Sequence, residues 1–255
     1  MKLQHALTTL IIVFVTVFSF GQSDIVKLTL YKTNGKIIYK YIPEDSDTLE
    51  IVKKEIYKIK GLEKLIYLKK LDLSRNKIST ILNIEGLSTL SDLKVLRLGH
   101  NNIKKITGLN NLQNLKDLFL WHNDIKAIEG LHNLASLEYL TFSFNKIKKI
   151  QGLNKLKSLH WLRIDCNSIT KIEGLNKLIN LRRLNLSFNK IKNIEGLDRL
   201  KNLKRLILSG NKISNITGLD KLTQLKRIEV DFNPIKKNKI SNIKNKYHWI
   251  KKWLY

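Results

Sequence analysis

The sequence predicts an α/β solenoid, a right-handed superhelix with a concave parallel β-sheet and short 3₁₀ or helical turns on its convex side. Three observations predict it. An asparagine returns at an almost constant period along most of the 255 residues. Two apolar residues, usually leucines, precede it at alternating positions, as the buried residues of a strand do. Apolar residues and a glycine follow at fixed offsets, as in "LKDLFLWHNDIKAIEGL", "LRRLNLSFNKIKNIEGL" and "LKRLILSGNKISNITGL".

The repeat occupies residues 49–235. The step from Asn76 to Asn101 is 25 residues because it contains three extra residues, and every later step is 22. One period before Asn76, Lys54 stands where the asparagine would be, while the other offsets are kept. The segment therefore holds about nine repeats, the first of them degenerate, and such a period is the signature of a solenoid. The repeated asparagines are Asn76, Asn101, Asn123, Asn145, Asn167, Asn189, Asn211 and Asn233.

Each part of the repeat has a physical role. Leu118 and Leu120 alternate before Asn123, so both point to one side of a short strand, and each repeat adds one parallel strand. The chain must then turn inward, where its backbone groups lose contact with water. An asparagine amide carries both donors and an acceptor, so stacked copies are expected to form a structural hydrogen-bonded ladder.

The return path of each repeat carries leucines three residues apart, as in Leu109, Leu112 and Leu115. This spacing fits 3₁₀ turns better than an α-helix. A glycine such as Gly130 then marks a tight backbone bend.

The pattern "LxxLxxLxLxxNxIxxIxGL" resembles the 22-residue leucine-rich repeats of protein phosphatase-1 regulatory subunits and of bacterial internalins. The resemblance covers about residues 49–235 and implies the fold. Adhesion of the internalin kind fits an exported chain better than the intracellular role of the phosphatase subunits.

Residues 1–21 have the layout of a secretory signal peptide. Lys2 precedes the uncharged apolar stretch 6–20, and the small residues Ser19 and Gly21 stand at the −3 and −1 positions of a cleavage site. The apolar core is short for a membrane span, which needs about 20 residues. We predict an exported chain, secreted, periplasmic or on the cell surface, with an uncleaved anchor as the alternative. Export disfavours nucleic acid as a partner.

Both ends of the solenoid need a cover for the hydrophobic core. Residues 22–48 contain two strand-like runs about Asn34-Gly35, a strong hairpin signal, and predict a β-hairpin cap. In residues 236–255, Ile240, Ile243 and Tyr247 begin an apolar face at helical spacing, with lysines on the remainder. We predict a C-terminal helical cap. The alternative is a basic amphipathic helix lying on a membrane.

The alternation of each strand turns a second set of residues outward on the concave sheet. Aromatic and arginine side chains gather there on neighbouring strands, and these residues often dominate binding surfaces. We predict a partner-binding face for a protein, with mutual packing of the rings as the alternative. The predicted residues are Arg97, Phe119, Trp121, Tyr139, Trp161, Arg163 and Arg183.

The formal charge of +26 leaves a glycan or another polyanion as the alternative partner, although most lysines fall in loops after the asparagines. No paired carboxylates, nucleophile elbow or phosphate loop occur, so we predict a non-enzymatic scaffold without catalytic residues or cofactors. His100 and His122 share one column, but without a third ligand we predict no metal. Cys166 is the only cysteine and is interpreted as a small packed residue.

Overall fold

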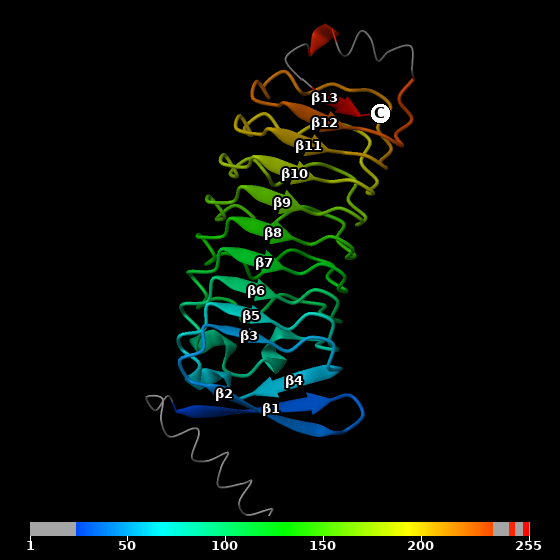
Figure 1. The fold of residues 1–255 in the computed structure, drawn as a ribbon. Helices are drawn as coiled ribbons and strands as arrows, with labels where there is room; N and C mark the ends of the chain where they lie inside the picture. The colour runs from blue at the N-terminus through cyan, green and yellow to red at the C-terminus, as the bar shows by residue number, and fades with distance from the viewer. Residues whose placement is uncertain (1–23, 237–244, 248–251, 255) are drawn as a thin grey trace, which may run out of the picture.

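The computed structural model describes residues 24–236, 245–247 and 252–254. It is a solenoid of stacked coils built on one parallel sheet of ten strands, in the order β13-β12-β11-β10-β9-β8-β7-β6-β5-β3 (Figure 1). The predicted solenoid with a parallel sheet is confirmed. The strands are β3 (Thr48–Glu50), β5 (Lys70–Asp72), β6 (Val95–Arg97), β7 (Asp117–Phe119), β8 (Tyr139–Thr141), β9 (Trp161–Arg163), β10 (Arg183–Asn185), β11 (Arg205–Ile207), β12 (Arg227–Glu229) and β13 (Lys252–Leu254).

Residues one period apart in the sequence are neighbours in space. Leu118 lies beside Leu140, which lies beside Leu162, and the same register continues to the next strands. Strands β5 and β6 keep this register although 25 residues separate them, with Leu71 beside Leu96. The three extra residues are accommodated near the 3₁₀ turn η2 (Ile81–Asn83), outside the sheet.

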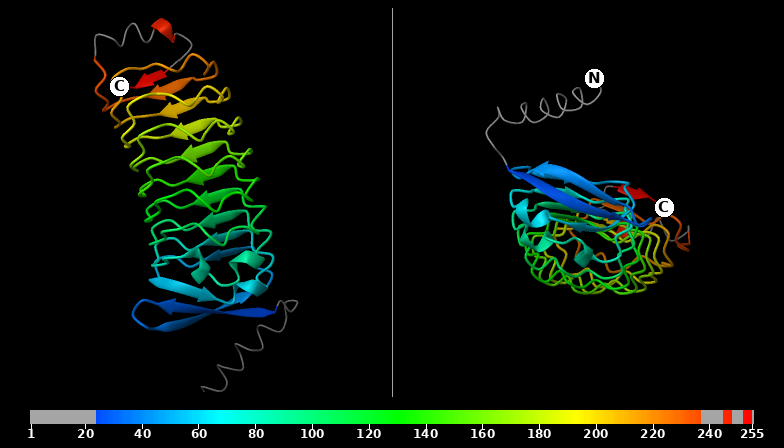
Figure 2. Two further views of the ribbon diagram at one scale, coloured as in Figure 1. Left: turned by 180° about the vertical axis from the view of Figure 1, so that it is seen from behind. Right: turned by 90° about the horizontal axis from the view of Figure 1, so that it is seen from below.

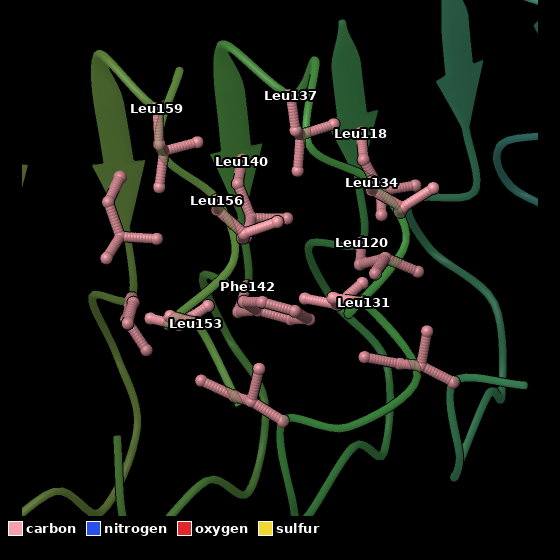
Figure 3. Packing of buried hydrophobic residues seen from close by; sticks show 14 of the residues in the cluster. Leu118, Leu120, Leu131, Leu134, Leu137, Leu140, Phe142, Leu153, Leu156 and Leu159 are labelled. Carbon is pink, nitrogen blue, oxygen red and sulfur yellow. The ribbon is translucent and has the colours of Figure 1, made fainter. Parts of the chain in front are cut away.

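The core is a continuous stack of leucine and isoleucine side chains enclosed by the coils (Figure 3). Phe142 occupies a position that holds leucine in the preceding coil, at Leu120, and isoleucine in the following one, at Ile164. All three are fully buried. Burial of each such side chain contributes roughly 1.5–3 kcal/mol, so the stability of the molecule accumulates from coil to coil.

The turns opposite the sheet have the 3₁₀ hydrogen-bond pattern that the leucine spacing predicts. The amide of Leu112 donates to the carbonyl of Leu109, and the amide of Leu115 donates to that of Leu112, both at 3.0 Å. Two further 3₁₀ turns are η1 (Leu62–Lys64) and η3 (Leu87–Thr89). The i to i+3 bonds let each coil close within few residues while its leucines point inward.

Glycine is required where the chain enters these turns. Gly152 has a φ of +71°, and a Cβ atom there would lie 2.5 Å from the carbonyl oxygen of Ile128 in the preceding coil. Both the backbone conformation and the close approach therefore exclude a side chain.

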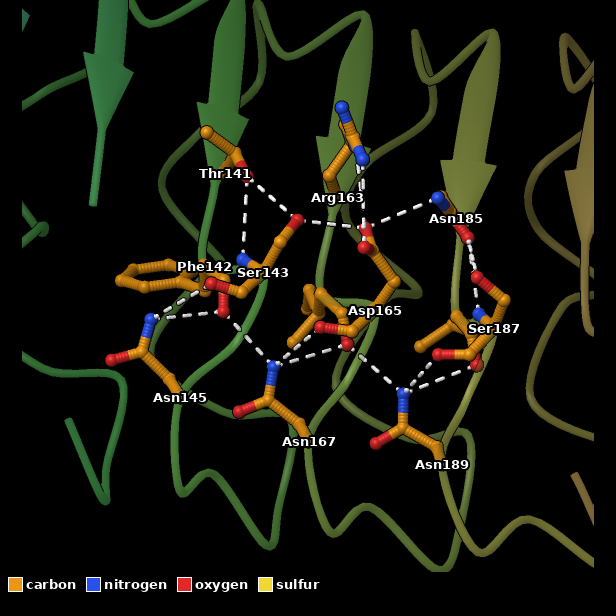
Figure 4. Close-up of polar contacts among 12 residues, drawn as sticks. Thr141, Phe142, Ser143, Asn145, Arg163, Asp165, Asn167, Asn185, Ser187 and Asn189 are labelled. Carbon is orange, nitrogen blue, oxygen red and sulfur yellow. Dashed lines mark hydrogen bonds and ion pairs between the residues drawn. The ribbon is translucent and has the colours of Figure 1, made fainter. Parts of the chain in front are cut away.

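The repeated asparagines join successive coils (Figure 4). The Nδ2 group of Asn167 lies 2.9 Å from the carbonyl of Phe142 in the preceding coil and 3.2 Å from that of Ile164 in its own coil. Its Oδ1 atom accepts from the amide of Ile147 at 2.9 Å. In the degenerate first coil, where Lys54 replaces asparagine, Oδ1 of Asn76 accepts the amides of Lys54 and Ile56. One asparagine therefore satisfies turns of two coils.

The residue before each asparagine adopts a left-handed backbone conformation, which the sequence analysis did not predict. Such a conformation is uncommon for residues with a side chain. Its repetition follows from the inward turn after the strand, which every coil makes in the same way. Apart from Gly210, this column consists of Arg75, His100, His122, Phe144, Cys166, Phe188 and Phe232, with φ between 50° and 58°.

A second sheet covers the N-terminal end of the solenoid, with strand order β2-β1-β4 (Figure 2). Its strands are β1 (Ile25–Lys32), β2 (Ile37–Pro43) and β4 (Ile56–Lys60). Strands β1 and β2 form an antiparallel hairpin about Gly35, and β4 belongs to the degenerate first coil. Val26, Leu28 and Leu30 of β1 point into the core.

The C-terminal end differs from the helical cap predicted over 236–255. Residues Lys252–Leu254 form strand β13, which pairs in parallel with β12, so the prediction of a helix is wrong for these three residues. Tyr247 is buried, and its hydroxyl donates to Asp220 at 3.3 Å. Residues 237–244 and 248–251 of the predicted helix lie outside the described residues.

Within the described part of the chain, no helix is both long enough and apolar enough to cross a membrane. The predicted signal segment, 1–21, lies outside the described residues.

Candidate protein-binding face

The face of the ten-stranded sheet that points away from the core, here called the sheet face, carries all seven predicted partner-binding residues. They come from strands β6 to β10, except Trp121, which lies two residues after the end of β7. Arg183 is exposed, and the other six are half-buried. The strand alternation thus places their backbones as expected, while their side chains divide into two groups.

The first group, here called the aromatic ribbon, consists of Arg97, Phe119, Tyr139, Trp161 and Arg183. The guanidinium of Arg97 lies 5.3 Å from the centre of the Phe119 ring. The Phe119 and Tyr139 ring centres are 4.9 Å apart, and those of Tyr139 and Trp161 are 4.8 Å apart in an edge-on arrangement. The guanidinium of Arg183 lies 4.9 Å from the Trp161 ring. The ribbon therefore crosses five adjacent strands without interruption.

Trp121 belongs to a second group beside the ribbon. Its indole covers Gly99 of the neighbouring coil, where an added Cβ atom would lie 2.5 Å from the ring. The ring also meets His100 edge-on at 4.2 Å. His100, His122 and Phe144 stack with centre distances of 4.3 and 4.1 Å. The indole is held in one orientation by these contacts.

A hollow of about 330 Å³ lies between the ribbon and the stacked rings. Aromatic rings form most of its wall, and hydroxyl and guanidinium groups form the rest. It is therefore suited to an apolar or aromatic side chain that also carries a polar group. The lining residues are Phe119, Trp121, Tyr139, Thr141, Ser143, Phe144 and Arg163.

Arg163 is fixed by a buried polar network beside the hollow (Figure 4). The Oδ1 atom of Asp165, only 4% exposed, accepts from Arg163 Nε at 3.2 Å, from Ser143 Oγ at 2.7 Å and from Asn185 Nδ2 at 3.1 Å. Burial disfavours the charged guanidinium, but Asp165 and, to a smaller extent, Tyr139 outweigh this and raise the pKa of Arg163. The strand alternation directs Asp165 to the sheet face, but the sequence alone does not reveal this network. The feature of the sequence that could have indicated the network is the presence of small polar residues at outward positions, namely Thr141, Ser143 and Ser187.

The sheet face also carries an acidic group. Partial burial raises the pKa of the Asp117 carboxyl, and the negative charge of Glu138 raises it further. The positive charges of Arg97 and Lys116 oppose this shift. Burial likewise raises the pKa of the neighbouring Tyr139 hydroxyl.

A second, more basic hollow of about 550 Å³ follows the loops that leave the first strands. It includes both histidines of the ring stack, His100 and His122. Burial lowers the pKa of His100, and the charges of His122 and Arg75 lower it further. The charged residues of its wall are Lys53, Glu55, Arg75 and Lys77.

Across the described residues, no three His, Cys, Asp or Glu side chains come together as metal ligands. His100 and His122 are ring neighbours, and the column continues with Phe144. Burial raises the pKa of the Cys166 thiol, and the charge of Asp165 raises it further, so the thiol form is favoured.

Family descriptions match most of the solenoid. The description "Leucine Rich Repeat" matches residues 67–90, "Leucine Rich repeats (2 copies)" matches 91–131 and 113–155, and "Leucine rich repeat" matches 157–213. No curated protein matches the chain.

Solved structures of bacterial proteins are similar to this fold. Internalin C2 from Listeria monocytogenes is 27% identical with a TM-score of 0.65, and the match covers 74% of this chain and 84% of internalin C2. A leucine-rich repeat protein from Leptospira interrogans is 25% identical with a TM-score of 0.61, over 75% of this chain and 62% of that protein.

The functional domain of InlJ from Listeria monocytogenes has the same fold, with 23% identity and a TM-score of 0.64. That match covers 80% of this chain and 49% of the InlJ domain, so the chain spans about half the length of that structure. The repeated sequence, the coil geometry and the matches agree, and the chain belongs to the leucine-rich repeat family, with repeats similar to those of the internalins.

Proposed function

We propose that the chain is an exported, non-enzymatic scaffold that binds a protein through its concave sheet face. The single observation that carries the proposal is the aromatic ribbon, which crosses β6 to β10 with its rings in mutual contact. Leucine-rich repeat folds generally act as interaction scaffolds, and the solenoid holds this surface on a rigid sheet. The export part of the proposal rests on the signal-like segment 1–21.

The rings of the ribbon serve binding because their orientations are set before a partner arrives. Tyr139 is held between Phe119 and Trp161, so little side-chain freedom remains to be lost on association. The rings remain half-exposed, and partly exposed aromatic surface gains free energy when a partner covers it.

The polar groups of the face indicate the chemistry of the partner. The hollow beside the ribbon accepts an anchoring apolar or aromatic side chain, and Arg163, fixed by Asp165, offers donors at its rim. Asp117 is a carboxyl whose pKa is raised by burial. A basic residue of the partner next to it would stabilise the charged form. We therefore propose a partner segment with an apolar anchor and a neighbouring cation.

The test is capture of proteins from the envelope of the producing cell, comparing the unchanged chain with a Trp121→Ala/Trp161→Ala variant. A protein that binds the unchanged chain and is lost with the variant supports the proposal. Tyr67→Ala is the matched control, since Tyr67 is an exposed ring outside the sheet face. Capture that survives both tryptophan changes rules out this face.

A second candidate function is glycan or polyanion binding, favoured by the basic hollow that includes Lys53, Arg75 and Lys77. Exposed lysines after the asparagines, such as Lys104, Lys126 and Lys148, extend this positive charge along the loops. Ionic strength separates the two functions. Affinity for a polyanion falls steeply as salt rises, whereas a contact made by the aromatic ribbon changes little.

A further inference from the structure

Strand β2 is the edge strand of the N-terminal sheet. The strand order is β2-β1-β4, so β1 covers only one of its edges, and no other described strand pairs with it. Figure 2 shows this hairpin lying across the end of the solenoid. A seven-residue edge strand offers unpaired backbone groups to any strand that can approach it.

The hydrogen bonds at the two ends of the hairpin show which residues face this free edge. The amide of Lys32 donates to Lys36, and the amide of Glu44 donates to Asp24. Hydrogen-bonded and non-bonded pairs alternate in an antiparallel ladder. The even-numbered residues of β2 therefore bond to β1, and the odd-numbered ones direct their N–H and C=O groups away from it. These outward residues are Ile37, Tyr39 and Tyr41.

The side chains of this edge are apolar as well. Ile37, Tyr39 and Tyr41 are 46%, 51% and 62% exposed, on the outer face of the hairpin. Edge strands of soluble proteins are commonly protected by charges, proline or a bulge. Here Lys36 and Glu44 flank the strand, and Lys40 within it points to the inner face. On the outer face, the ammonium of Lys27 in β1 lies 3.9 Å from the centre of the Tyr39 ring and leaves the edge itself open.

We infer that this edge binds β2 of a second copy of the same chain, antiparallel and symmetric about Lys40. In this register Tyr39 of one copy lies opposite Tyr41 of the other, and Ile37 lies opposite Pro43. The outward backbone groups then form about six hydrogen bonds between the chains, fewer than a full ladder because Pro43 has no N–H group.

Charge complementarity and the length of the shared ladder together select the occupant and the register. Symmetry about Lys40 places Lys36 of each copy opposite Glu44 of the other, and opposite charges across a strand pair stabilise it. Symmetry about Tyr39 or Tyr41 loses both of these ion pairs. Symmetry about Ile42 would also oppose Lys40 and Glu44, but it pairs fewer residues of β2, which ends at Pro43. The two Lys40 side chains meet at the centre, but each points to the inner face, where its ammonium donates to the carbonyl of Glu50 in its own chain at 3.1 Å.

The register is tested by disulfide cross-linking of the full chain with Cys166→Ser as background, which removes its only cysteine. Lys40→Cys is expected to cross-link to itself, because Cα atoms of a directly opposed pair lie about 4.5–5.5 Å apart, within disulfide range. Tyr39→Cys alone is the matched control and is expected to stay unlinked. Mixing Tyr39→Cys with Tyr41→Cys restores the cross-link.

Sedimentation of the purified chain tests the dimer itself. The unchanged chain is expected at twice its monomer mass. Tyr39→Pro is expected to be monomeric and folded, because the lost N–H group faces away from β1. Tyr39→Thr is the control, which keeps that N–H group and the dimer. A monomeric unchanged chain, a dimer that survives Tyr39→Pro, or cross-linking in another register overturns the inference.

Discussion

Asn167 and Phe142 lie 25 residues apart in the sequence, and the side-chain amide of the first donates to the backbone carbonyl of the second at 2.9 Å. The same amide contacts the carbonyls of Ile164 and Asp165, and its oxygen accepts the amide of Ile147. A single side chain therefore holds the inward turns of two coils together.

Replacing Asn167 with alanine is expected to destabilise the fold strongly. The change leaves the amide of Ile147 without its partner, and an unsatisfied buried group costs about 1–3 kcal/mol. It also removes bonds to three carbonyls, which keep their bonds to Asn145, Asn189 and Phe144. We expect a total loss on the order of 2–4 kcal/mol, measured as the free energy of unfolding in urea. Asn180→Ala is the matched control, since that exposed amide donates only to Lys157. Equal losses for both variants would contradict a structural ladder.

Gly152→Ala is expected to destabilise the chain more than Gly35→Ala. Both glycines have a positive φ, but a Cβ atom at Gly152 would meet the carbonyl of Ile128 at 2.5 Å, whereas Gly35 has open space around it. The additional loss at Gly152 should be about 1–3 kcal/mol, typical of overpacking. Thermal unfolding followed by circular dichroism measures the difference. Similar melting temperatures for the two variants would show that the coils can move apart at Gly152 with little loss of stability.

Phe142→Ala is expected to cost about 3–5 kcal/mol, because it opens a cavity in a fully buried position. Phe142→Leu should cost less, since Leu120 and Leu186 hold the equivalent positions in other coils. Urea unfolding of the two variants checks this order. A leucine variant as unstable as the alanine variant would mean that the coil is shaped specifically around the ring.

Acidification is expected to weaken the fold through His100. Its pKa is lowered from 6.5 in the folded chain by burial and by the charges of His122 and Arg75. Since the unfolded chain then binds the proton more readily, stability is complete above pH 6.5 and falls as the pH drops through the folded pKa. His100→Asn keeps a residue that tolerates the left-handed backbone. Between neutral and acidic pH, the melting temperature of this variant should decrease less than that of the unchanged chain. An equal decrease in both proteins would rule out His100 as the cause.

The sequence predicted the coil geometry because one physical requirement sets each part of the repeat. The spacing of Leu118 and Leu120 before Asn123 defines a strand with one buried side, and a period of 22 residues makes the next strand its neighbour. The alternation that buries these leucines also places Phe119 and Trp161 on the sheet face. These inferences depend on backbone periodicity, which can be read directly from the sequence.

Side-chain partners on the sheet face were not predictable in the same way. Trp121 and Trp161 were both predicted on the sheet face, two and six residues before their asparagines. The indole of Trp121 turns toward Gly99 and His100, whereas that of Trp161 joins Tyr139. The burial of Asp165 depends on Ser143 one coil before and Asn185 one coil after. Such outcomes depend on the volumes of neighbouring residues from three coils at once.

The C-terminal segment shows a different limit. Its helical spacing predicted a cap, but Lys252–Leu254 extend the sheet beyond β12. The open edge of a parallel sheet offers backbone bonds that a short apolar segment can use. The periodicity of an isolated segment contains no information about this competing partner.

The three added residues near η2 leave the pairing of β5 with β6 intact, and Leu82 of this turn is 64% exposed. The solenoid therefore accommodates additional residues at this point without a change of register in the sheet. A short epitope tag or fluorophore attachment site inserted after Leu82 is expected to report on the molecule while leaving the buried core and the sheet face unchanged.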